Sequence, residues 1–124
     1  MTDRRRGIGD RGEQAVAAWY EGRGYRVLAR NWRVAGGELD LVLLDPGRAE
    51  AVFCEVKTRT SGAFGTGFDA VTPGKLRRLR RLAGRWLAEA KPPGTVVRHV
   101  RLDVAALGPG PGGVPVVSVL EAVG

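Results

Sequence analysis

Two kinds of hydrophobic spacing follow one another along the chain. Residues 76–87 place apolar side chains every three or four positions, which is the spacing that gives a helix one apolar face. Residues 38–44 and 51–57 are instead short, nearly continuous apolar blocks, a pattern typical of buried strands. The predicted elements are helices near 11–22 and 73–90 and strands near 25–33, 38–44, 51–57, 96–107 and 114–122.

Residues with strong positional preferences mark the ends of both predicted helices. Asp10 is the expected N-cap of the first helix, and Gly22 or Gly24 is expected to end it. Thr72 can cap the second helix and Pro73 suits its first position, where no backbone N–H is needed. Both helices are therefore predicted with defined ends.

The order of elements predicts a single α/β domain over residues 1–124. The order α-β-β-β-α-β-β gives a mixed central sheet flanked by helices. The short stretch 45–50 makes the second and third strands an antiparallel hairpin, and the second helix returns the chain to a parallel fourth strand by a right-handed crossover. Residues 1–9, which are rich in Arg and Gly, are expected to be mobile.

Charged side chains interrupt both strands of the predicted hairpin. Successive strand residues point to opposite faces, so Glu55 and Lys57 share one face of the third strand. Asp40 interrupts the second strand in the same way. Counting from the turn at 45–50 sets Asp40 near Glu55 or Lys57, where opposed Cβ atoms lie about 4.5–5.5 Å apart. The hairpin is therefore predicted to bring two carboxylates and one amine together.

This grouping has a specific chemical use. Two close carboxylates repel, and the usual relief is a shared proton or a hard cation such as Mg²⁺, which prefers oxygen ligands. A lysine beside that cation is placed to orient or deprotonate the attacking water. An acidic pair with a lysine, in a basic protein, is what metal-assisted hydrolysis of a phosphodiester requires.

The composition favours a polyanionic partner. Twenty Lys and Arg residues face 13 Asp and Glu residues, which gives a net charge of +7 and a pI near 10.7. No apolar run approaches the length of about 18 residues needed to span a membrane, so a cytoplasmic protein without membrane contact is expected. The single cysteine, Cys54, lies within an apolar strand and is expected to be a small buried side chain.

Three motifs carry a family resemblance. The segments "GDRGEQAVAAWYEGRGY", "GELDLV" and "FCEVKTR", at these spacings, resemble the YraN family of bacterial proteins. That family is placed in the PD-(D/E)XK restriction-endonuclease-like superfamily and is similar in layout to archaeal Holliday junction resolvases. By this resemblance Asp40 corresponds to the first strand acid, Glu55 and Lys57 to the (D/E)XK pair, and Glu13 to an acid on the first helix. "GEL" precedes Asp40 where the nominal motif has proline, a substitution common in such enzymes.

The resemblance also implies a restriction-endonuclease-like fold and a metal-dependent reaction. On this basis Asp40, Glu55 and the backbone carbonyl of Val56 are expected to hold Mg²⁺ or Mn²⁺. Lys57 is expected to position the attacking water, with Glu13 completing the site. The implied activity is a Mg²⁺-dependent endonuclease acting on DNA, with branched or structured DNA as a candidate substrate, and resolvase-like enzymes tend to act as homodimers.

Basic residues that flank the long polar segment after the third strand are candidates for phosphate contacts: Arg59, Lys75 and Arg78. The arginine-rich side of the second helix can also be a solvated face without a ligand. Two other function classes remain open, a nuclease-like fold that binds nucleic acid without cutting it and an interaction module. Clustered acids, which repel phosphate, disfavour both.

Individual site residues also have simpler interpretations. Glu13 lies three positions after Asp10, which is the spacing of a helix capping box. Glu55 and Lys57 can form an ordinary salt bridge on a half-exposed strand. Glu38 shares a strand face with Asp40 but is expected to be a surface charge at the start of the strand.

Overall fold

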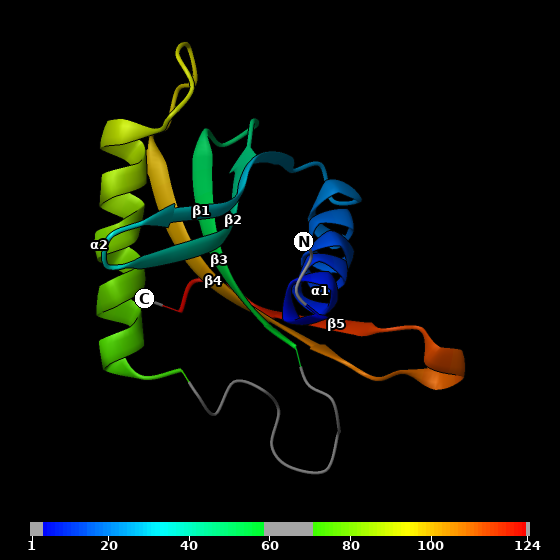
Figure 1. Ribbon diagram of the computed structural model, residues 1–124. Helices are drawn as coiled ribbons and strands as arrows, with labels where there is room; N and C mark the ends of the chain where they lie inside the picture. Colours follow the sequence, from blue (N-terminus) through cyan, green and yellow to red (C-terminus); the bar gives the residue numbers. More distant parts are fainter. Residues whose placement is uncertain (1–3, 59–70, 124) are drawn as a thin grey trace.

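Five strands form one mixed sheet with one helix packed on each face (Figure 1). The computed structural model describes residues 4–58 and 71–123. The observed order confirms the predicted α/β class and the α-β-β-β-α-β-β layout. The elements are α1 (Arg4–Glu21), β1 (Arg26–Val34), β2 (Gly37–Asp45), β3 (Glu50–Thr58), α2 (Pro73–Glu89), β4 (His99–Gly108), a short 3₁₀ helix η1 (Pro111–Gly113) and β5 (Val116–Leu120).

The strands lie in the order β1-β2-β3-β4-β5, with one parallel pair at the centre. β2 and β3 form the predicted antiparallel hairpin, whose register runs from Asp45 opposite Glu50 to Leu41 opposite Cys54. β3 and β4 pair in parallel, as expected for a connection that passes through α2. Neither helix offers an apolar stretch that could cross a lipid bilayer within the described residues.

The hydrophobic core has two halves, one on each face of the sheet. α2 packs on one face, where Trp86 meets Phe53 edge-on with ring centroids 5.7 Å apart. α1 packs on the other face, where Val16 and Tyr20 lie against strand residues that include Cys54. Cys54 has no exposed surface, which confirms its expected role as a small buried side chain.

β2 bends near its beginning, close to Asp40. The alternation of strand residues predicts that Leu39 and Leu41 share a face, but Leu39 packs in the α2 half of the core and Leu41 in the α1 half. Strand twist and bending rotate the two side chains apart over two residues. Gly37, with φ at 154°, allows the close approach at the start of the bend, since a Cβ there would lie 2.8 Å from Cδ1 of Leu82.

The beginning of α1 differs from the sequence prediction. The helix starts at Arg4, so Asp10 lies in its interior and is not its N-cap, and residues 4–9 form its first turns. Arginine is a good helix former, and extending an existing helix adds a hydrogen bond for each residue fixed. The prediction for α2 was correct, because the Thr72 side chain accepts a hydrogen bond from the Lys75 backbone N–H at 3.2 Å.

Candidate metal and nucleic-acid site

Asp40 lies where β2 and β3 begin to separate. The pairing of the two strands ends at Leu41 and Cys54, and continuing its register by one position sets Asp40 opposite Glu55. Oδ2 of Asp40 accepts a hydrogen bond from the backbone N–H of Val56 at 2.8 Å. The predicted juxtaposition of Asp40 with the Glu55–Lys57 segment is therefore present.

This contact also gives the direction of the Val56 carbonyl. In an extended strand the N–H and C=O of one residue point toward the same neighbouring strand. Because the N–H of Val56 reaches Asp40, the carbonyl of Val56 faces β2 as well. The carbonyl oxygen that the family resemblance expects to bind metal thus points toward β2, the strand that carries Asp40.

Two further carboxylates lie close to that of Asp40. One ligand oxygen from each of Glu13, Glu38 and Asp40 lies within 4.8 Å of the others. Glu13 comes from α1 and is only 8% exposed, whereas Glu38 lies at the exposed start of β2. Glu55 is outside this group among the described residues. The structure therefore surrounds Asp40 with acids from two elements, in addition to the acid on β3.

The capping-box interpretation of Glu13 is wrong. It required a helix that begins at Asp10, and α1 begins at Arg4, so Glu13 lies well inside the helix. Glu38 is exposed, as expected, and forms an ion pair with Arg33 whose Nε lies 3.0 Å from Oε2. Sequence reasoning nevertheless set Glu38 aside as a surface charge. The signal that could have included it was the strand face that it shares with Asp40.

The surroundings of Asp40 disfavour its ionised form. Burial is the largest cause, and it raises the pKa of Asp40 from 3.8 to about 6. The hydrogen bond from Val56 opposes this rise, the negative charges of Glu38 and Glu55 add to it, and the positive charge of Lys57 opposes it. Near neutral pH Asp40 therefore carries a negative charge that its neighbours do not fully compensate.

Glu55 is held by two cations. Its Oε1 lies 3.6 Å from Nζ of Lys57 and 3.8 Å from Nη2 of Arg78. The Glu55 side chain is 18% exposed, so these contacts lie in a partly shielded position. The salt bridge between Glu55 and Lys57 is thus present, and it also fixes the Lys57 ammonium beside the carboxylates.

Basic side chains from α2 lie next to the acids. Arg78 pairs with Glu55, and the neighbouring Lys57 side chain lowers the pKa of Lys75. Two of the three predicted phosphate-contacting residues, Lys75 and Arg78, therefore lie at the site. Arg59 lies outside the described residues.

Comparison with known proteins identifies the family. The model of uncharacterised protein family UPF0102 matches residues 12–107. The chain belongs to this family. It is 50% identical over 123 residues to a UPF0102 protein of Mycolicibacterium gilvum, covering 99% of this chain and 98% of the relative. It is 51% identical over 122 residues to one from Mycolicibacterium vanbaalenii (98% and 97%) and 52% identical over 100 residues to one from Beutenbergia cavernae (81% and 80%). UPF0102 is the YraN family, so the family expected from the sequence is confirmed.

The carboxylates of this UPF0102 protein suit a hard divalent cation. Two oxygens on one Mg²⁺, at about 2.0–2.1 Å each, lie at most about 4.2 Å apart. Of three oxygens on one octahedral ion, at least two pairs are neighbours, which lie about 2.9 Å apart. The Glu13, Glu38 and Asp40 oxygens lie within 4.8 Å of one another, so side-chain movements of up to about 2 Å bring them into range. All three donors are oxygens, which favours Mg²⁺ or Mn²⁺ over softer metals.

Proposed function

We propose that this UPF0102 protein is a Mg²⁺-dependent endonuclease of the PD-(D/E)XK type that hydrolyses DNA phosphodiesters at the site around Asp40. The observation that carries the proposal is the position of Asp40. This half-buried carboxylate has a pKa raised to about 6, converges with Glu13 and Glu38, and lies beside Lys57. Repulsion between neighbouring carboxylates destabilises a fold, and a bound divalent cation offsets that repulsion.

The residues that would hold the cation come from three elements. Asp40 is the central ligand, and Glu55 and the Val56 carbonyl are the ligands expected on β3. Glu13 from α1 completes the set, and Glu38 adds a further oxygen at the exposed edge. A Mg²⁺ or Mn²⁺ ion bound here supplies Lewis-acid polarisation of the phosphate and a lowered pKa for the attacking water.

Lys57 is the proposed group for positioning that water. Its ammonium lies 3.6 Å from Glu55 and acts on Asp40 as a positive charge that lowers the pKa of the acid. A flexible ammonium held beside Glu55 and near Asp40 is placed to donate a hydrogen bond to water and to exchange a proton with it.

The basic side chains of α2 are proposed to hold the nucleic-acid backbone. Arg78 pairs with Glu55, Lys75 lies near Lys57, and the chain as a whole carries a net charge of +7. Phosphate contacts of this kind position the substrate without reading its sequence. Branched or structured DNA, which the family resemblance suggests, is the first substrate class to test.

A nuclease assay tests the proposal directly. Linear duplex, single-stranded and four-way-junction DNA are incubated with the full-length protein and Mg²⁺ or Mn²⁺, with EDTA as a blank. Asp40→Asn is expected to abolish cleavage. Asp45→Asn makes the same chemical change at the other end of β2, where the side chain caps the Gly47 N–H, and is expected to cleave normally. Metal-independent cleavage, or cleavage by Asp40→Asn at the wild-type rate, would refute the assignment.

One observation favours a second function. Oε1 of Glu55 already lies near two cations, Lys57 and Arg78, as in a purely structural ion-pair network. A protein that only binds nucleic acid would retain that network and its basic helix. Binding of all three DNA substrates in EDTA, with no cleavage under any metal condition, would select this alternative.

A further inference from the structure

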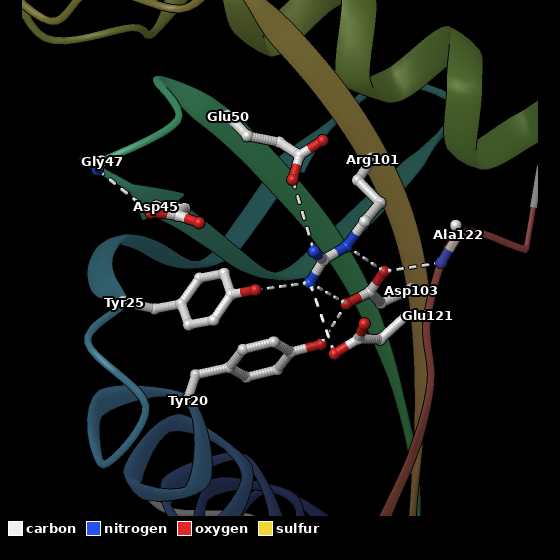
Figure 2. A network of polar contacts seen from close by, with 9 residues as sticks. All are labelled: Tyr20, Tyr25, Asp45, Gly47, Glu50, Arg101, Asp103, Glu121 and Ala122. Carbon is white, nitrogen blue, oxygen red and sulfur yellow. Dashed lines mark hydrogen bonds and ion pairs between the residues drawn. The ribbon is translucent and has the colours of Figure 1, made fainter.

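A network of polar side chains, centred on the buried Asp103, connects α1 to the sheet (Figure 2). It is separate from the Glu13, Glu38 and Asp40 group. Tyr20 of α1 donates its hydroxyl hydrogen bond to Oδ2 of Asp103 on β4 at 2.6 Å. Arg101 donates to the same carboxylate twice, from Nε to Oδ1 and from Nη2 to Oδ2, each at 2.9 Å. The Ala122 backbone N–H adds a fourth hydrogen bond, to Oδ1 at 3.1 Å. Asp103, which has no exposed surface, is therefore a fixed point for α1.

Arg101 also holds the chain that leaves α1. Its Nη2 donates to the hydroxyl of Tyr25 at 3.0 Å, and its Nη1 lies 3.3 Å from Glu50 of β3. The rings of Tyr20 and Tyr25 meet edge-on with centroids 5.1 Å apart. Burial, followed by the nearby Cys54 and Asp103, raises the pKa of Tyr20 far above its ordinary value, so its hydroxyl keeps the proton that it donates.

Tyr20 and Glu13 belong to the same buried stripe of α1. Residues 13, 16, 17 and 20 are all buried and follow helical spacing. Tyr20 lies seven residues after Glu13, two helical turns or about 10 Å along the axis. A rotation of α1 by roughly 15° would move an atom about 6 Å from the axis by about 1.5 Å. That displacement is about a third of the 4.8 Å within which the Glu13, Glu38 and Asp40 oxygens lie, so it would change how they share one ion.

We propose that Tyr20 is the positioning residue of the carboxylate site, because its hydrogen bond to Asp103 fixes the rotation of α1 that sets Glu13 against Asp40 and Glu38. This inference rests on the proposed metal-dependent function. Tyr20 itself touches neither the cation nor the substrate. It acts through the helix, so its loss is expected to weaken cation binding only by displacing Glu13.

A double-mutant cycle measures this coupling. Mn²⁺ binding to the full-length protein is measured by calorimetry at pH 8 for wild type, Tyr20→Phe, Glu13→Gln and the double variant. Tyr20→Phe keeps the ring, and Arg101 still neutralises Asp103. Because residues that orient metal ligands typically contribute 10–100-fold to affinity, Tyr20→Phe is expected to weaken binding about tenfold. In the Glu13→Gln background the same change is expected to cost less than about twofold.

Tyr25→Phe is the matched control. It also removes one tyrosine hydroxyl from the network, here a half-buried one, but Tyr25 lies after α1, and the hydrogen bond between Tyr20 and Asp103 remains. This variant is expected to bind Mn²⁺ within about twofold of wild type even if it unfolds more easily. Amide hydrogen exchange without metal provides a second comparison. Tyr20→Phe should speed exchange in α1 and leave α2 unchanged.

A second variant keeps the test available if Tyr20→Phe does not fold. A Cβ at Gly12 would lie 2.8 Å from Oγ1 of Thr58 and 3.1 Å from Cδ2 of Leu107. Gly12→Ala is therefore expected to displace the part of α1 that carries Glu13 while the hydrogen bond between Tyr20 and Asp103 remains. Alanine also favours the helix. Gly12→Ala is expected to weaken Mn²⁺ binding, again with little further loss in the Glu13→Gln background.

The outcomes separate the two proposals. If wild type binds Mn²⁺ but Tyr20→Phe binds equally well, the positioning role is wrong and the metal site stands. If Tyr20→Phe weakens binding by the same factor with and without Glu13→Gln, the effect is general destabilisation and the positioning role is also wrong. If wild type binds no Mn²⁺, the metal site fails, and this inference fails with it.

Discussion

Replacing Asp40 by asparagine is expected to stabilise the metal-free protein. Asparagine keeps the size of the side chain and retains an oxygen that can accept the hydrogen bond from Val56 N–H. It removes a negative charge that is half-buried and repelled by Glu38 and Glu55. The variant should therefore lose activity and gain stability, which is the combination expected for a functional residue held against the preference of the fold.

The magnitude follows from the pKa of Asp40. At about 1.4 kcal/mol for each pKa unit, the rise from 3.8 to about 6 corresponds to about 3 kcal/mol. This is an upper value, because water reaches a half-buried side chain and the weaker hydrogen bond of asparagine offsets part of the gain. A measured gain of about 1–3 kcal/mol at pH 8 is expected.

The effect has a defined pH window. The folded-state pKa of Asp40 lies above the unfolded value, so between pH 4 and 6 the folded protein binds more protons than the unfolded chain. The contribution of Asp40 to the free energy of unfolding is therefore full below pH 4 and is lost as the pH rises through 6. Asparagine does not titrate. The difference between variant and wild type should be small at pH 4 and reach its full size by about pH 7.

Urea denaturation in EDTA at pH 4, 5, 6, 7 and 8 measures this difference. Asp45→Asn is the control, since it retains Asp40 and should still lose stability between pH 4 and 7 as wild type does. Saturating Mn²⁺, at about 100 times its dissociation constant, should stabilise wild type by about 2.7 kcal/mol and Asp40→Asn by much less. If Asp40→Asn is less stable than wild type at pH 8, or if the difference does not depend on pH, the reasoning is refuted.

Four other predictions follow from the same geometry. Lys57→Ala should bind Mn²⁺ normally but slow single-turnover cleavage by roughly 10²–10⁴-fold, and an equal loss of binding would contradict its role. Lys75→Ala should weaken DNA binding similarly for all sequences and lower the slope of log affinity against log salt by about one, whereas an unchanged slope would remove it from the interface. Cleavage by wild type should rise as the pH passes about 6, where Asp40 loses its proton, and a flat rate from pH 5 to 8 would argue against this. Gly37→Ala should lower the free energy of unfolding by about 1–3 kcal/mol, because the new Cβ would lie 2.8 Å from Leu82, and an unchanged urea midpoint would contradict the close approach.

The sequence was sufficient to place the acids and the lysine of the hairpin. Asp40, Glu55 and Lys57 stand out because charges interrupt strands that are otherwise apolar, and burying charge is costly. Their proximity could be predicted because a short turn fixes the register of a hairpin. The register observed between β2 and β3, from Asp45 opposite Glu50, agrees with that count.

Local patterns alone could not place the acid that depends on tertiary contacts. Asp10 has the residue type and spacing of a helix cap, so local chemistry favoured a later helix start and left a capping role open for Glu13, which only the family resemblance placed at the site. The docking of α1 depends on Tyr20 meeting Asp103, 83 positions away, and no local pattern predicts that pairing. The bend of β2, which separates the packing of Leu39 and Leu41, is also set by tertiary packing.

The fully buried Asp103 and the half-buried Asp40 have opposite surroundings, and the difference distinguishes a structural role from the proposed functional one. Asp103 receives hydrogen bonds from Arg101, from Tyr20 and from the Ala122 backbone, so its charge is compensated and it stabilises the docking of α1. Asp40 accepts a backbone hydrogen bond from Val56, while burial and, after it, the neighbouring acids raise its pKa. A side chain retained only for stability would be expected to have partners like those of Asp103. The uncompensated charge of Asp40 is instead what the proposed divalent cation would require, and the proposed role of the network around Asp103 is to hold such a site rigid.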